Sequence, residues 1–101
     1  MEYNKLVRDR IPAIIAAQGG NAHTRVLGDE EYRECLEKKL DEEVAEYHES
    51  KSLEELADVL EVLFALTEAG GYSREELFSV CENKRENRGG FSDKIFLISA
   101  D

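Results

Sequence analysis

The segment from Leu53 to Leu66 carries apolar side chains on nearly every side when it is wound as a helix. At about 100° per residue, they cover most of the helix circumference. They are Leu53, Leu56, Val59, Leu60, Val62, Leu63, Phe64 and Leu66. Such a helix must be covered on several sides, and a chain of 101 residues has little material to spare. We therefore expect a second copy to supply part of the cover, in a homodimer or a homotetramer.

Helix start and stop signals predict a mainly α fold, a bundle of about four helices. Glycine pairs separate the segments, and Asp29, Ser52 and Ser73 are residue types that favour N-caps. The expected helices span residues 12–18, 29–47, 52–69 and 73–87. Residues 22–27 carry no helical period, and the short apolar stretch 94–98 could pair with them as a second β-strand. We expect a single domain over residues 1–101.

Charge is unevenly distributed along the chain. The stretch from Asp29 to Glu61 holds 14 acidic and 4 basic residues, a net charge of −10, which is also the net charge of the whole chain. A nucleic-acid-binding protein more often shows a basic excess, so we expect no nucleic-acid partner. A metal ion between the carboxylates, with a phosphate chain held by basic residues near the two termini, fits this distribution better.

Targeting and cysteine signals are weak. The first residues form no apolar signal segment, and no window approaches the roughly 18 continuous apolar residues of a membrane span. Cys35 and Cys81 form no C-x-x-C pair and are expected to be reduced, packing residues. We expect a cytoplasmic protein that does not contact a membrane.

Two acidic patterns lie twelve residues apart, E-E-x-x-E at 42–46 and E-E-x-x-D at 54–58. Residues three apart lie one above the other on a helix, so each pattern places two carboxylates on a common face. Hard cations prefer carboxylate and water oxygens, which favours Mg²⁺, with Mn²⁺ as a substitute. The predicted metal ligands are Glu43, Glu46, Glu55 and Asp58.

The angular positions favour a site, although two simpler explanations remain open. Glu43 lies about 60° from Leu40, at the edge of the apolar stripe, and Glu55 lies in line with Val62. A carboxylate among apolar residues needs a partner. However, Glu55 could instead reach back to the amide of Ser52 as part of a capping box. Acidic helix residues in general also form solvated faces more often than sites.

Other chemistries are excluded by residue type. Ferritin-like Glu-x-x-His pairs are absent, because Ala45 stands three residues before His48. The sequence also contains no EF-hand loop, no Walker A lysine loop and no G-x-S-x-G nucleophile.

The chain resembles the all-α nucleoside triphosphate pyrophosphatases, which include the MazG proteins, dimeric dUTPases and phosphoribosyl-ATP pyrophosphohydrolases. The resemblance lies in the segments 39–46 and 54–60, which look like the E-x-x-E and E-x-x-D metal motifs of that superfamily. The opening 3–12 and the closing K-R-x-x-R-G-G-F at 84–91 look like a small, predicted house-cleaning branch. The resemblance covers most of the chain.

This resemblance implies Mg²⁺-dependent hydrolysis of a nucleoside triphosphate to the monophosphate and pyrophosphate, in a MazG-like bundle. Glu43 or Glu46 would orient or deprotonate the attacking water. Basic residues near the termini would hold the phosphate chain, and two glycines would let backbone amides approach it. The basic candidates are Lys5, Arg8, Lys84, Arg85, Arg88 and Lys94, and the two glycines are Gly89 and Gly90. Lys39, which lies beside Glu46 on the helix, is a further site candidate.

Two alternative functions remain open. One is the hydrolysis of phosphoribosyl-ATP in histidine synthesis, within the same superfamily. The other is a non-catalytic helical module that dimerises or binds a basic partner through its acidic face. Surface solubility and charge balance would then explain the basic residues equally well.

Overall fold

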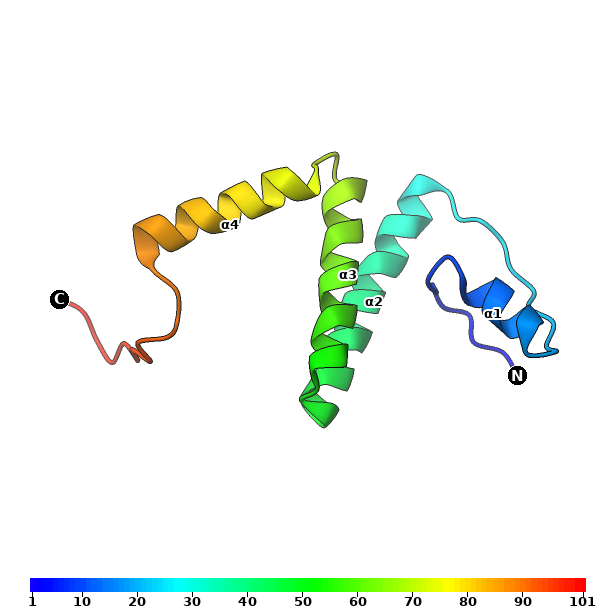
Figure 1. Cartoon of the computed structure of the whole chain (residues 1–101). Helices are drawn as coiled ribbons and strands as arrows, with labels where there is room; N and C mark the ends of the chain where they lie inside the picture. The colour runs from blue at the N-terminus through cyan, green and yellow to red at the C-terminus, as the bar shows by residue number, and fades with distance from the viewer.

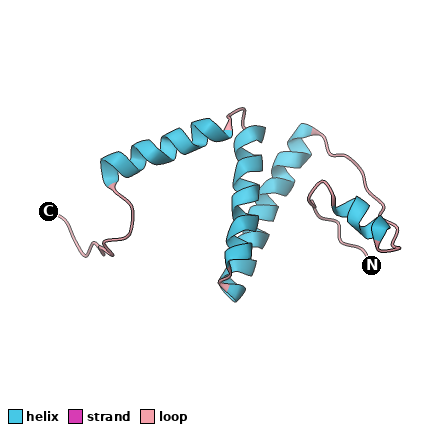
Figure 2. Ribbon diagram, viewed as in Figure 1, coloured by secondary structure: helices cyan, strands magenta, loops and turns pink.

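The computed structural model describes all 101 residues and contains four helices joined by loops, with no β-strand (Figures 1 and 2). The helices are α1 (Ile11–Ala17), α2 (Asp29–Ser50), α3 (Leu53–Ala69) and α4 (Arg74–Arg88). The prediction of a mainly α fold with about four helices is confirmed. Each predicted boundary lies within three residues of the observed one, as expected when caps and glycines set the helix ends.

The central unit is an antiparallel hairpin of α2 and α3, which run side by side in opposite directions (Figure 1). Lys51 ends α2 in a left-handed conformation, with φ of 55°, and its amide donates to the Tyr47 carbonyl at 2.7 Å. The chain then turns directly into α3. The three buried residues of the molecule, Leu36, Glu43 and Val62, all belong to this hairpin. The small core of a single chain therefore lies within this hairpin.

Serine side chains start α3 and α4 as predicted. Ser52 Oγ accepts from the amide of Glu55 at 3.2 Å, and Ser73 Oγ accepts from that of Glu76 at 3.1 Å. The expectation that Asp29 caps α2 is wrong, because Gly28 is the N-cap and Asp29 is already helical. Asp29 lies instead in an acidic first turn, where carboxylates interact favourably with the positive end of the helix dipole.

Helix α4 extends away from the hairpin and packs on α3 only near its own start (Figure 1). The rings of Phe64 and Phe78 meet edge to face at 5.8 Å, and the Arg74 guanidinium lies 4.3 Å from the Phe64 ring centre. Beyond this junction, α4 and residues 89–101 are exposed. No helix combines the length and the hydropathy that a bilayer-spanning helix requires.

The predicted pairing of residues 22–27 with 94–98 is wrong. Neither segment is a strand, and the two lie at opposite ends of the molecule, on either side of the hairpin (Figure 2). The reason is the direction of α4, which carries residues 94–98 away from α2 and from the loop before it. An apolar stretch without helical period can be read as a strand, but its partner depends on how distant helices pack.

We predict that Ser73→Ala lowers the free energy of unfolding by about 1 kcal/mol. The change removes a reciprocal cap, in which Glu76 Oε1 also accepts from the Ser73 amide at 3.4 Å. Urea unfolding followed by circular dichroism measures the loss. The matched control is Ser79→Ala in the middle of the same helix, at an exposed position. Equal losses in the two variants would contradict the role of the cap.

Candidate metal centre

Three carboxylates from the two helices of the hairpin meet at one place. Glu43 comes from α2, and Glu55 and Asp58 come from the first two turns of α3. One oxygen of each lies within 4.8 Å of the others. The antiparallel pairing of α2 with α3 produces this cluster, because it brings the middle of one acidic pattern against the other. Three of the four predicted metal ligands are thus brought together.

Glu43 is the most buried residue of this cluster. Its relative exposure is 7%, although charged residues are rarely buried without compensation. The Glu43 Oε1 atom lies 3.2 Å from Lys39 Nζ, whereas Glu43 Oε2 and Glu55 Oε2 are buried and accept no hydrogen bond. A buried carboxylate oxygen without a partner costs free energy. A cation placed among these oxygens would remove that cost.

Two carboxyl groups of the cluster, Glu43 and Glu55, have raised pKa values. Burial raises the pKa of the Glu43 carboxyl, the nearby Glu46 carboxyl raises it further, and Lys39 opposes both. Burial also raises the pKa of Glu55, and the charges of Asp58 and Glu43 add to that rise. Nearby carboxylates thus make Glu43 and Glu55 harder to ionise, as expected for like charges that share a site.

The capping explanation for Glu55 is not supported by the geometry. The Ser52 amide donates to Ser50 Oγ at 3.3 Å instead of to the Glu55 side chain. In α4, by contrast, Glu76 completes the reciprocal box with Ser73. The side chain of Glu55 is therefore not used as a cap, and its carboxylate faces Glu43 and Asp58.

Glu46 lies at the edge of the cluster. It is exposed and is not part of the close group of three oxygens, yet its carboxyl raises the pKa of Glu43 and, by hydrogen bonding, lowers that of Glu55. Its side chain therefore lies beside both residues, on the side open to solvent. That position suits a group that contacts water next to a metal.

The N-terminal segment places two positively charged side chains beside the acidic residues of the hairpin. Arg8 Nη2 donates to Asp58 Oδ1 at 2.7 Å, and Lys5 Nζ lies 3.5 Å from Glu42 Oε1. Lys39 Nζ lies 3.5 Å from the same Glu42 oxygen. The predicted residues Lys5, Arg8 and Lys39 are thus placed around the carboxylates. Sequence reasoning missed Glu42 as the bridge between two lysines, because helical spacing selected Glu43 and Glu46 from the same pattern.

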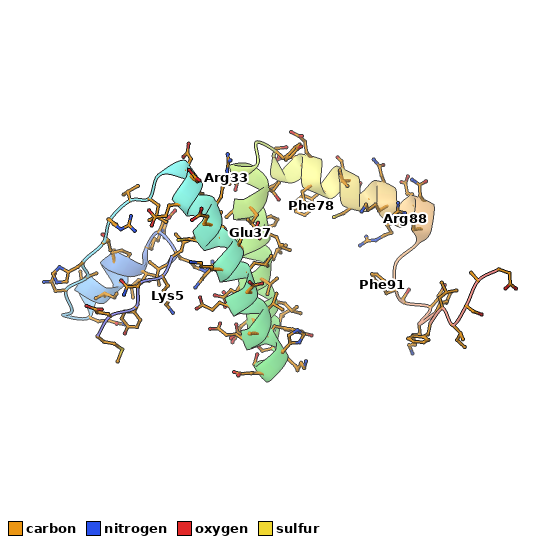
Figure 3. All side chains as sticks on the ribbon, turned by 180° about the vertical axis from the view of Figure 1, so that it is seen from behind. Lys5, Arg33, Glu37, Phe78, Arg88 and Phe91 are labelled. Atoms are coloured by element: carbon orange, nitrogen blue, oxygen red, sulfur yellow. The ribbon has the colours of Figure 1, made fainter.

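The predicted basic residues of the C-terminal part are not placed at the cluster of the same chain. Figure 3 puts Lys5 beside α2, whereas Arg88 and Phe91 lie at the opposite end of the molecule. Lys84 and Arg85 precede Arg88 on the outer half of α4. A separate open hollow of about 280 Å³ involves Arg88, Gly89, Gly90 and Lys94. Within a single chain these residues therefore do not lie beside the carboxylates, because α4 leads away from the hairpin.

The donor set fits a hard divalent cation. The oxygens belong to carboxylates alone, without histidine or cysteine, which favours Mg²⁺ or Mn²⁺ over zinc. Glu43, Glu55 and Asp58 would bind directly, and Mg²⁺ ordinarily keeps several waters in addition to one or two carboxylates. Glu46, exposed at the edge of the cluster, would accept a hydrogen bond from such a water.

Comparison with known proteins finds a match to part of this chain. An uncharacterized protein from Mycolicibacterium smegmatis is 57% identical over 42 residues, which is 42% of this chain and 43% of that protein. The chain therefore matches less than half the length of this curated relative. No protein-family model matches the chain, and no solved structure matches it.

We predict that Glu55→Gln stabilises the metal-free protein at neutral pH. Its pKa is raised in the folded state, so charged Glu55 destabilises the fold above that raised pKa, and this effect disappears as the pH falls below the ordinary carboxyl value of 4.5. Urea unfolding from pH 4 to pH 8 should show a gain that is largest at high pH. The control is Glu54→Gln, at an exposed neighbouring position. A gain that is independent of pH would contradict the assignment.

Proposed function

We propose that this protein is a Mg²⁺-dependent nucleoside triphosphate pyrophosphohydrolase, which converts a nucleoside triphosphate to the monophosphate and pyrophosphate. The observation that carries the proposal is the buried Glu43 carboxylate, which has one oxygen without a hydrogen-bond partner and which lies in a cluster with the carboxylates of Glu55 and Asp58. These residues belong to the two acidic motifs that resemble the all-α pyrophosphatases. We place the activity in the cytoplasm, as house-cleaning of noncanonical nucleotides.

In this proposal, metal coordination and activation of the attacking water belong to different residues. Bound Mg²⁺ would neutralise the phosphate chain and stabilise charge on the departing pyrophosphate. Glu43 is held by Lys39 and is suited to fixed coordination. Glu46 is exposed at the edge of the cluster, and we assign to it the orientation and deprotonation of the water that attacks the α phosphorus. The bond between that phosphorus and the bridging oxygen then breaks, and pyrophosphate leaves.

We also assign phosphate binding to Arg8. Its pair with Asp58 is half exposed, with side-chain exposures of 54% and 39%. Such pairs are worth about 0 to 1 kcal/mol, so a divalent cation can replace the guanidinium at Asp58. Arg8 would then be free beside the metal, where its planar donor group can bind a phosphate oxygen.

We predict that Glu43→Gln and Asp58→Asn each reduce Mg²⁺-dependent pyrophosphate release at least ~100-fold, because loss of a direct ligand exceeds the ~10- to 100-fold cost of losing an outer partner. The assay uses a panel of ordinary, deoxy and damaged nucleoside triphosphates together with phosphoribosyl-ATP. Both variants should also lose the rise in melting temperature that Mg²⁺ gives the unchanged protein.

The matched control for these variants is Asp41→Asn, on an exposed face of α2. This variant should retain the activity. Release from phosphoribosyl-ATP alone would replace the proposal by the histidine-pathway reaction. Absence of release from every substrate, with folding confirmed, would contradict an enzymatic role and favour an interaction module.

We predict that Arg8→Ala tightens Mg²⁺ binding about two- to fivefold, since it removes a competing cation whose pair is worth at most about 1 kcal/mol. Isothermal titration calorimetry measures the affinity. The same variant should raise KM, because the phosphate loses a contact. Arg10→Ala is the control, since Arg10 is exposed and forms no ion pair. Weaker Mg²⁺ binding in Arg8→Ala would show that Arg8 supports the site instead of competing for it.

A further inference from the structure

The part of the chain before α2 is attached to the hairpin by charge and not by packing. Helix α1 packs against none of the other helices, and no residue of 1–28 is buried. Three ion pairs tie this part to the hairpin, namely Lys5 with Glu42, Arg8 with Asp58 and Arg25 with Glu31. All six side chains are partly exposed, so solvent screens the pairs and each of them can open. The attachment therefore depends on the charge of the hairpin carboxylates.

Two of these pairs reach different helices of the hairpin. Lys5 pairs with Glu42 on α2, and Arg8 pairs with Asp58 on α3. The axes of packed helices lie about 8–10 Å apart, and three residues of extended chain span about 10 Å. Residues 5–8, here called the strap, therefore cross from α2 to α3. The crossing lies at the carboxylate cluster, because Asp58 belongs to the cluster and Glu42 directly precedes another member of it.

The two ends of the strap respond differently to a divalent cation. Asp58 is one of the clustered carboxylates, so a bound cation competes with Arg8 for its oxygens. Glu42 lies outside the cluster, and its Oε1 atom is 3.5 Å from Lys5 Nζ and 3.5 Å from Lys39 Nζ. A cation in the cluster thus opens the Arg8 end of the strap and leaves the Lys5 end in place.

Helix α1 is joined to the end of the strap that opens. The Ile11 amide, at the start of α1, donates to the Arg8 carbonyl at 3.0 Å, so Arg8 and α1 move together. The movement is limited on the other side by Arg25, which donates to both carboxylate oxygens of Glu31 at 2.9 and 2.6 Å. Glu31 lies in the first turn of α2, and α1 lies beside the hairpin between the two attachments (Figure 1). Opening therefore releases residues 6–24.

We propose that the strap is a latch, which is closed on Asp58 in the metal-free protein, opens when a divalent cation binds the cluster, and closes again on a phosphate chain held there. The fixed Lys5 end keeps Arg8 near the cluster, so its guanidinium meets the phosphate oxygens at a high effective concentration. The cation therefore binds before the phosphate compound. Closing on phosphate rests on the proposed function, whereas opening by the cation rests on the cluster alone.

Backbone ¹⁵N relaxation tests the opening, because the ¹H–¹⁵N nuclear Overhauser effect falls where the chain moves within nanoseconds. In the metal-free, ¹⁵N-labelled protein, residues 6–17 should give values close to those of the hairpin. Saturating MgCl₂ should lower these values, whereas NaCl of the same ionic strength should not. Residues 25–31 are the internal control and should keep their values, since their ion pair lies outside the cluster. Values for residues 6–17 that MgCl₂ leaves unchanged, or that NaCl lowers equally, would overturn the proposal.

The variant Arg8→Gln removes the closed state and leaves the carboxylates intact. Residues 6–17 should be mobile in this variant without metal. MgCl₂ should still shift the amide signals of Glu43 and Asp58, which shows that the cation binds. The matched control is Arg10→Gln, at an exposed arginine without an ion pair, and it should behave like the unchanged protein. An Arg8→Gln variant as rigid as the unchanged protein would overturn the latch.

Inorganic tripolyphosphate, a triphosphate chain without a nucleoside, tests the closing. It is added with MgCl₂ in large excess, so that the cluster keeps its cation. The values of residues 6–17 should then be restored in the unchanged protein and not in Arg8→Gln. Opening by MgCl₂ without this restoration would overturn the closing step. Opening and closing without pyrophosphate release from any nucleotide would support the latch and contradict the proposed function.

Discussion

The packing of α2 against α3 buries a carboxylate where a hydrophobic pair would be more stable. The acidic cluster and the basic residues beside it lie around this buried group. Glu43 lies in the same interface as Leu36 and Val62, with one oxygen beside Lys39 and the other unpaired. The like charges of Glu55 and Asp58 make its position less favourable still. A fold that retains such an arrangement gives up stability at that place, which is common at functional sites.

Local signals in the sequence predicted the helices well. Ser52, Ser73 and the glycine pairs act within a few residues, so their effect can be inferred without knowledge of tertiary structure. The same holds for Glu43, Glu55 and Asp58, because helical spacing and the apolar margin together specify their faces. The choice between a capping and a clustered Glu55 required the structure, since both use the same spacing. It was decided by one hydrogen bond, from the Ser52 amide to Ser50 Oγ.

Long-range relations were not predictable to the same degree. The contact of Arg8 with Asp58 joins residues fifty positions apart, and no periodicity indicates it. The direction of α4 separates Arg88 from the cluster and residues 94–98 from 22–27, and it depends on how Phe78 and Arg74 pack on Phe64. Charge patterning identified these residues by type but not by place. A sequence thus indicates which residue types a site needs more readily than where the fold places them.

The very short connection through Lys51 and Ser52 has a consequence for the order of folding. Glu43 lies twelve residues from Glu55 and fifteen from Asp58, so the cluster closes by local contacts with a small loss of chain entropy. Structures with mainly local contacts form rapidly. The hairpin can thus assemble its carboxylates early, before the termini or any second chain take their places. Cation binding would then be available to a newly made chain and would favour the hairpin while the rest of the molecule is still unorganised.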